Sequence, residues 1–249
     1  MVTMTNSPQE VCCSGAVSLS TRVVELSHVL YPGKEQYKLE IKPQKERTGP
    51  GSILYEVALW SHVGTHVEYA LHFLPNGRDI STLPLRRLVG EAAIVDLRHK
   101  QTNEPIDIED FMAADIRERD IVITWTGRDN LYRTPNSHDR PYVTKKAADW
   151  LANDRKISAL GTDSSGFEVR GGAEHEPNHF IFFDREDPIP VIECMGHLGE
   201  LTQKRVFLIA LPMRIVGLDA WPVRVIAIEG NAETNDVVLA QLSNLFALP

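Results

Sequence analysis

The stretch from His62 to His72 constrains this chain most, because it gathers three histidines and an acidic residue within eleven positions and reads HVGTHVEYALH. His62, His66 and Glu68 are all even-numbered, so in extended backbone their side chains share one face. On a helix Glu68 would point away from the two histidines, and Gly64 would weaken the helix at its centre. The pattern therefore predicts an extended strand or a tight turn.

These residue types suit a metal ion. Imidazole nitrogen and carboxylate oxygen are donors that Zn²⁺ or Mn²⁺ accepts, and two histidines with one acid leave coordination positions open, as catalysis requires. A histidine alone is commonly a core or surface residue with one hydrogen bond. The clustering predicts a site for a divalent metal, Zn²⁺ or Mn²⁺. A closed site with four ligands that only holds loops together is the non-catalytic alternative.

Size and charge limit the classes of partner. The chain has 249 residues and 43% hydrophobic content, enough for a substantial core in one large domain or two small ones. Its net charge of −8 and pI near 5.6 disfavour binding to nucleic acid or to an anionic membrane. No span reaches the roughly 18 apolar residues that a membrane helix needs. We expect a small-molecule partner, no nucleic acid and no membrane.

The N-terminus and the cysteines indicate a compartment. Residues 1–20 are small and polar, without a basic segment followed by a long apolar run, so we expect a flexible N-terminal tail and no secretion signal. Cys12, Cys13 and Cys194 are odd in number and lack a CxxC pattern, which disfavours a disulfide framework or a thiolate zinc site. A cytoplasmic protein is predicted.

The N-terminal third is rich in predicted strands. Residues 22–33 form a β-rich run stopped by a Pro-Gly turn, and residues 37–41 alternate as in a half-buried strand. Residues 42–51 form a polar loop. Residues 52–60 are a predicted strand that delivers the chain into His62.

Strands and helices alternate through the middle of the chain. This alternation predicts an α/β fold, with a mixed sheet because the N-terminal third is strand-rich. The polar loop 127–142 contains His138, which we expect to be exposed and without a catalytic role. The predicted elements are a short helix near 84–88, a strand at 91–97, a helix from an Asp107 cap to about 117, a strand at 120–126, a helix from a Thr144 cap to about 153, and strands at 157–163, 189–193 and 205–211.

A second group of candidate residues begins with the sequence GTDSSG at 161–166. It lacks the Gly-x-Ser-x-Gly pattern of a nucleophile elbow, so Asp163 and Ser164 are interpreted as turn support and not as a serine nucleophile. Farther on, His175 and His179 lie in a predicted loop, and an apolar strand then ends at Glu193.

The first cluster resembles the signature His-x-Gly-Thr-His-x-Asp-x-Pro-x-His of the metal-dependent cyclase-like hydrolases, a family that includes bacterial kynurenine formamidase and isatin hydrolase. Glu68 stands at the family's aspartate, with the same charge on a longer arm, so a ligand role survives with a shifted metal position. Ala70 stands at the family's proline and follows the bulky Tyr69, which changes the pocket shape. The opening segment and the closing Pro-x-Arg turn also resemble the family, so the likeness covers roughly residues 22–230.

The resemblance implies a second set of ligands. His179 and Glu193 match the family's second metal half, although His175 stays a rival because the spacing to Glu193 is longer than the family's. The implied centre holds two ions, or one tight and one loose, bridged by Glu68. In that arrangement His62 and His66 complete one site, and His179 and Glu193 complete the other.

The resemblance also implies a fold and an assembly. The fold would be the swivelling β/β/α cyclase-like type, a single domain over residues 21–249, and homodimers or homotetramers would be expected. The implied activity is arylformamidase-like hydrolysis of an amide, cyclic amide or lactone at a carbon–nitrogen bond other than a peptide bond. Alternatives are a metal-dependent cyclase or dehydratase, and a non-catalytic protein that uses metal only to fix its loops.

Catalytic and substrate-binding roles complete the expectation. His72 lies four residues beyond Glu68 and is the predicted catalytic proton carrier, because a histidine titrates in the range that a shuttle needs. A core or supporting histidine is the alternative. Trp60, Phe73 and Trp221 are candidates for an apolar wall around an aromatic substrate, although isolated aromatic residues usually belong to a core.

Overall fold

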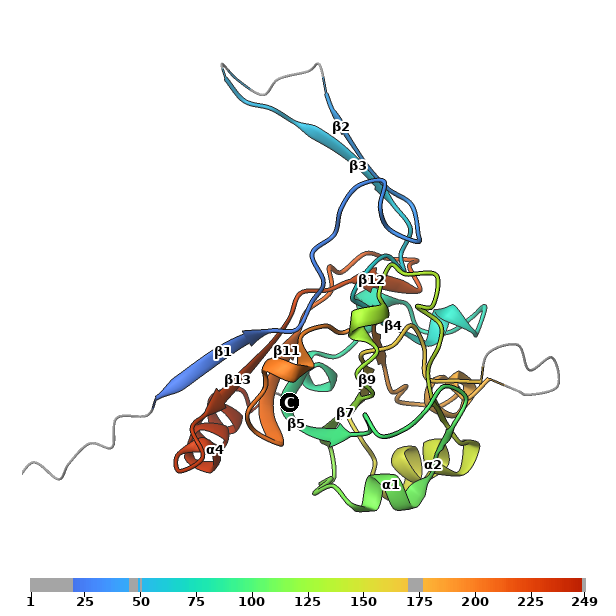
Figure 1. The fold of residues 1–249 in the computed structure, drawn as a ribbon. Coiled ribbons are helices and arrows are strands. Elements are labelled where there is room, and N and C mark those ends of the chain that lie inside the picture. Colours follow the sequence, from blue (N-terminus) through green and yellow to red (C-terminus); the bar gives the residue numbers. More distant parts are fainter. Residues whose placement is uncertain (1–19, 45–48, 50, 170–176, 248–249) are drawn as a thin grey trace, which may run out of the picture.

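A nine-stranded mixed sheet organises the fold (Figure 1). The computed structural model describes residues 20–44, 49, 51–169 and 177–247. The strands of the sheet, in spatial order, are β1 (Thr21–Glu25), β13 (Val225–Gly230), β11 (Arg205–Ala210), β5 (Val89–Asp96), β7 (Ile121–Trp125), β9 (Ala159–Thr162), β10 (Val191–Glu193), β4 (His66–Glu68) and β12 (Ala220–Pro222).

The sheet combines parallel and antiparallel pairs. The neighbours β5, β7, β9 and β10 run parallel, and the strands beyond them on both sides pair antiparallel. The predicted α/β class with a mixed sheet is confirmed. The strands expected near 91–97, 120–126, 157–163, 189–193 and 205–211 are β5, β7, β9, β10 and β11.

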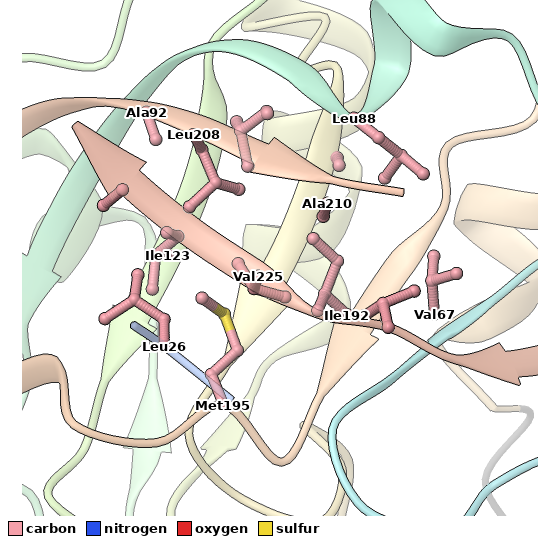
Figure 2. Packing of buried hydrophobic residues seen from close by; sticks show 14 of the residues in the cluster. Leu26, Val67, Leu88, Ala92, Ile123, Ile192, Met195, Leu208, Ala210 and Val225 are labelled. Atoms are coloured by element: carbon pink, nitrogen blue, oxygen red, sulfur yellow. The ribbon is translucent and has the colours of Figure 1, made fainter. Parts of the chain in front are cut away.

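The parallel strands are buried on both faces. Successive side chains of β7 enter different cores: Ile121 and Ile123 lie in the first, and Val122 lies in the second. This is why the strand reads as a continuous apolar run instead of an alternating one. Figure 2 shows the first core, where Ile192 of β10 and Val67 of β4 lie with residues of the antiparallel strands.

Within the described residues, four α-helices accompany the sheet. Residues of α1 (Ile108–Met112), α2 (Lys145–Asp149) and α3 (His179–Phe183) contribute to the second core, and α4 (Asn235–Leu245) packs on β11 and β13. A π-helical turn, Trp150–Asp154, continues α2. The predicted caps are confirmed: Asp107 forms a capping box at α1, and the Thr144 hydroxyl accepts from Ala147 N at α2.

The helix expected to run to about residue 117 ends earlier, at Met112. After Met112 the backbone N–H groups leave the helical pattern: Ala114 N donates to Phe111 O at 3.0 Å, and Arg117 N donates to the Asp120 carboxylate at 2.7 Å. The short helix expected near 84–88 is a 3₁₀ turn, Leu85–Arg87. Further 3₁₀ turns are Ala70–His72, Ile80–Thr82, Asp129–Leu131 and Leu198–Glu200, and β6 (Pro105–Ile106) pairs with β8 (Tyr142–Val143).

A hairpin projects from the body of the molecule (Figure 1). It consists of β2 (Leu39–Pro43) and β3 (Tyr55–Leu59), which pair with each other and, within the described residues, with no other strand. The strand predicted at 52–60 is thus present as β3. The strand predicted at 37–41 is present as β2, but it runs from Leu39 to Pro43, so the loop does not begin at residue 42. The predicted half-burial is wrong, because only Leu39 of this strand is buried. The hairpin projects from the body, so neither of its faces packs against a hydrophobic core.

The register of the sheet positions the first sequence motif. Strand β4 lies between β10 and β12, with His66 opposite Glu193 and Glu68 opposite Ala220. Val67 is fully buried in the first core, so the side chains of His66 and Glu68 point to the other side of the strand. The predicted shared face therefore holds for these two residues.

Some expectations fall outside the described part of the chain. The predicted tail, residues 1–20, lies there except for Ser20, and so do Cys12, Cys13 and His175. Among the described residues, no helix combines the length and the apolar character needed to span a bilayer.

Candidate metal centre

Glu68 lies at the centre of a group of histidines. Its Oε1 atom is 2.7 Å from His62 Nδ1 and 3.2 Å from His66 Nε2, and its Oε2 atom is 2.9 Å from His179 Nε2. Glu68 is only 3% exposed. One buried carboxylate thus touches histidines from both of the segments that the sequence singled out.

The donor atoms form two overlapping sets that could hold a metal ion. One set is His62, Glu68 and His72, and the other is His66, Glu68 and Glu193, with all donor atoms of a set within 4.8 Å of one another. Each set has three protein donors, so coordination positions remain open, as in catalytic sites and unlike closed structural ones. Glu68 is common to both sets, while His179, which contacts Glu68 Oε2, belongs to neither.

A tight turn brings His62 back toward β4, so His62 does not lie on the predicted strand. Gly64 in this turn has φ of +71°, and a Cβ there would lie 2.3 Å from Leu30 Cδ2. The next residue, Thr65, donates its hydroxyl to Cys194 O at 2.6 Å and accepts from His28 N at 3.0 Å. The Gly-Thr pair thus fixes the turn against the end of β10.

Each histidine of the cluster forms a hydrogen bond to an oxygen atom through the ring nitrogen that does not face Glu68. Such partners select the ring tautomer and direct the other nitrogen toward a metal. The pairs are His66 Nδ1 with Gly64 O at 2.8 Å, His179 Nδ1 with Glu168 Oε1 at 2.8 Å, His62 Nε2 with Asp219 Oδ2 at 2.7 Å, and His72 Nδ1 with Asp219 Oδ2 at 3.0 Å.

Glu168 and Asp219 were missed by the sequence analysis. Neither residue belongs to a local pattern that carries chemistry: Glu168 follows the GTDSSG segment, and Asp219 precedes the closing Ala-Trp-Pro. Only their positions in space beside histidines identify them. His72 lines the cavity and also belongs to one donor set with His62, so its position allows a role as a metal ligand as well as a proton carrier.

Hydrogen bonds raise the pKa of two histidines. Burial by itself would lower the pKa of His62, but its hydrogen bonds to Asp219 and Glu68 outweigh burial and raise the pKa to about 10. The pKa of His179 is also raised to about 10, because hydrogen bonds to Glu168 and Glu68 outweigh its burial. Protons on these rings balance the acids, and a divalent cation would displace them on binding.

The acids of the cluster repel one another. Burial opposes ionisation of Glu68, but hydrogen bonds from His179 and His62 hold its pKa well below the usual range. Burial, followed by the charge of Glu68, raises the pKa of Glu193 to about 7. A divalent cation would relieve this repulsion and accept the nitrogen and oxygen donors present, so the residues fit such an ion.

The cluster opens into a cavity of about 600 Å³. Trp60 and Trp221, two of the three aromatic residues expected to contact substrate, line it. Phe73, the third, is not among the residues that line it. Its ring instead stacks on His179, with the centroids 4.5 Å apart, and packs against the second core, where it supports the histidine from behind.

His138 was expected to be exposed, and this expectation is wrong. It is half-buried and lines the cavity, with Nδ1 2.9 Å from Ser165 Oγ. The loop 127–142 is held in place at its start, because the Asp163 carboxylate accepts from the backbone N–H of Thr126 and Gly127 among others. Asp163 thus acts as the turn support that the sequence indicated.

Together, the mixed sheet and the open His/Glu donor sets define a class: an α/β protein with a candidate catalytic metal centre. Comparisons with known proteins make this specific. The family model described as "Putative cyclase" matches residues 24–169, more than half of the chain. The chain belongs to this cyclase family, as the resemblance of its first motif implied.

Individual relatives agree with the family. A kynurenine formamidase of Sphingopyxis alaskensis is 27% identical over 167 residues, covering 66% of this chain and 75% of that protein. Cyclase-like protein 2 of Oryza sativa subsp. japonica is 26% identical over 237 residues, covering 90% and 85%. A solved structure described as a potential metal-dependent hydrolase with cyclase activity has a TM-score of 0.69 and 28% identity, covering 84% and 98%. Isatin hydrolase A from Labrenzia aggregata, at 20% identity, shares the fold with a TM-score of 0.70, covering 84% and 93%.

We predict that Glu68→Gln lowers the metal content of the purified protein at both sets of donors, because the amide loses the charge and one oxygen donor that both sets share. Metal analysis measures the number of Zn²⁺ or Mn²⁺ ions per chain. Glu56→Gln on the exposed face of β3 is the control and should leave the content unchanged. Equal metal content in the two variants would count against a bridging Glu68.

Proposed function

We propose that this protein is a metal-dependent hydrolase that cleaves an amide, cyclic amide or lactone, with a carbon–nitrogen bond other than a peptide bond as its main target. The observation that carries the proposal is the pair of open donor sets that share Glu68 at the base of a cavity of about 600 Å³. The names of the relatives, kynurenine formamidase and isatin hydrolase, support the same class of reaction.

The proposed cofactor is Zn²⁺ or Mn²⁺, as one or two ions. In the grouping that the family motif implies, His62, His66 and Glu68 would hold one ion, and His179 and Glu193 would join Glu68 at the other. The donor sets instead place His62 with His72 and His66 with Glu193 around Glu68, and His179 contacts Glu68 without belonging to either set. The mixed nitrogen and oxygen donors, without thiolate, suit either metal. Such an ion, when bound, supplies an activated water near neutral pH and polarises a carbonyl group. His175 remains a rival of His179.

The chain's own residues bind and orient the substrate. Trp60 and Trp221 offer apolar surface to an aromatic or other apolar part of a small molecule, while His138 and Ser165 offer polar atoms on the cavity wall. The buried base of the cavity keeps the carboxylate of Glu68 away from bulk solvent, which strengthens electrostatic interactions there. A substrate carbonyl at this base would lie beside the donor sets.

Proton delivery to the leaving nitrogen is assigned to His72. The His72 side chain is 29% exposed, and its Nε2 atom lies 3.8 Å from Glu68 Oε1, farther than those of the other histidines that contact this acid. It can therefore reach both the base of the cavity and its solvent. The position inside a donor set keeps a ligand role as the alternative.

The open donor sets favour a catalytic protein over one that uses metal only to fix its loops, because a closed site would admit no substrate. No feature of the cavity favours ring closure or dehydration over hydrolysis. The cytoplasmic location stays a prediction.

The function is tested by metal removal and a substrate panel. We expect the purified protein to hydrolyse at least one of formyl-aryl amides, isatin-like lactams and lactones, to lose that activity in chelator, and to regain it with Zn²⁺ or Mn²⁺. Product formation is followed by chromatography. Full activity in metal-free protein would refute the mechanism, and metal binding without turnover on the whole panel would favour a binding protein.

For His72→Ala, we predict retained metal but turnover lower by ~10²–10⁴-fold, the usual contribution of a positioned acid or base. The loss should be greater for amides than for activated esters, since an amine leaving group needs a proton. Metal analysis and kcat are measured on the same samples, with His99→Ala, an exposed histidine, as the control. Loss of metal would make His72 a ligand, and undiminished turnover would leave it a supporting residue.

We also propose a homodimer or homotetramer built through the hairpin β2–β3. An isolated two-stranded hairpin is at best marginally stable in water, and unpaired strand edges tend to associate. The hairpin exposes Ile41, Tyr55 and Val57 by 45%, 51% and 53%. A contact with a second copy of the chain would cover these side chains.

We expect Val57→Lys to shift the protein toward monomer, because it buries a charge in the proposed contact. Sedimentation velocity measures the mass in solution. Val237→Lys on α4, a helix distant from the hairpin, should leave the mass unchanged, since Val237 is 49% exposed and Val57 is 53% exposed (Figure 1). A monomeric unmodified protein, or an oligomer that tolerates Val57→Lys, would contradict the proposal.

A further inference from the structure

A single carboxylate oxygen serves two histidines of the centre. Asp219 Oδ2 lies 2.7 Å from His62 Nε2 and 3.0 Å from His72 Nδ1, and the two rings lie 4.4 Å apart, centroid to centroid. His62 belongs to the proposed ligands, and His72 is the proposed proton carrier. Asp219 therefore touches one residue of each kind with the same atom.

The chemistry of these groups limits the ring tautomers. An ionised carboxylate only accepts hydrogen bonds, so each nitrogen that faces Asp219 must carry the hydrogen. A neutral His62 then presents a bare Nδ1 to the centre, and a neutral His72 presents a bare Nε2. The two rings thus use different nitrogens, and for His72 the hydrogen is on Nδ1, the less common position in free histidine.

Two hydrogen bonds hold Asp219 in place, one to its backbone and one to its side chain. Tyr69 N donates to Asp219 O at 2.9 Å, next to the register pair of Ala220 with Glu68. On the side chain, Ser61 Oγ donates to Oδ1 at 2.9 Å, so the other oxygen stays turned toward the rings. The anchors come from the turn before β4 and from the segment after it, the same segments that carry the two histidines.

We propose that Asp219 is a positioning residue that fixes the tautomers of His62 and His72 together, and so couples the metal donor to the proton carrier. The proposal rests on the proposed function for the role of His72. The orientation of the two rings can be measured without any measurement of turnover. Asp219 does not line the cavity, so it acts through the histidines and not on the substrate.

The test compares Asp219→Ala and Asp219→Asn with Asp79→Asn in the full-length, Zn²⁺-loaded protein. Asp79 is a matched control, because its carboxylate accepts from Gly217 N and Ser81 N and so supports the same loop without touching the cluster. Nitrogen-15 NMR of labelled histidines reads the tautomers, and competition with a chelator measures Zn²⁺ affinity. Thermal unfolding reports any general loss of structure.

In the unmodified protein we expect the hydrogen on Nε2 of His62 and on Nδ1 of His72. Asp219→Ala should abolish the Nδ1 hydrogen signal of His72 and weaken Zn²⁺ binding by about 10–100-fold, the usual effect of removing a partner of a metal-binding histidine. Asp219→Asn, which keeps an acceptor oxygen, should restore the tautomer in part. Asp79→Asn should change neither, whatever it does to unfolding.

The inference is overturned if Asp219→Ala keeps both tautomers, or if its Zn²⁺ affinity stays within about threefold of that of Asp79→Asn. It also fails if the unmodified chain binds no Zn²⁺. If that chain binds Zn²⁺ but hydrolyses no substrate of the panel, the proposed function fails, while the NMR and affinity results still decide the role of Asp219.

Discussion

The buried carboxylate of Glu68 is the interaction on which the centre depends. An isolated charge at 3% exposure would be costly, and the partners that sustain it are His62, His66 and His179. The side chain uses both oxygens for this, one toward each half of the site. Although glutamate is longer than the aspartate of the family motif, both of its oxygens contact histidines here. Asp219 and Glu168 contact the histidines around this carboxylate and not the carboxylate itself.

The sheet makes this arrangement possible. Strand β4 has only three residues, and it is held on both edges by β10 and β12, which come from distant parts of the chain. Because Val67 is buried in the first core, a shift of one residue would turn His66 and Glu68 into the core and expose an apolar side chain. The core therefore fixes the register, and the register fixes the donors.

The outer parts of the site are less regular and come from loops. Asp163 holds the start of the loop 127–142 through its backbone N–H groups, and that loop brings His138 to the cavity. The ring of Phe73 stacks on the ring of His179 and does not line the cavity. The sheet thus carries His66, Glu68 and Glu193, while His62, His72 and His179 come from a turn, a 3₁₀ turn and the start of α3. Loops and the base of the hairpin shape the space for a substrate. This division is common in enzymes, because loops tolerate variation that a sheet does not.

The sequence by itself determined what depends on near neighbours. The spacing of His66 and Glu68 set their common side, and the residues Asp107 and Thr144 marked true helix starts, because strand period and capping are local properties. Only the tertiary structure decided that Asp219, 157 residues from His62, forms a hydrogen bond with that ring. It also decided that the hairpin projects from the body and that its side chains Ile41, Tyr55 and Val57 are exposed. No local pattern encodes such facts, since they arise from packing between segments that are distant in the chain.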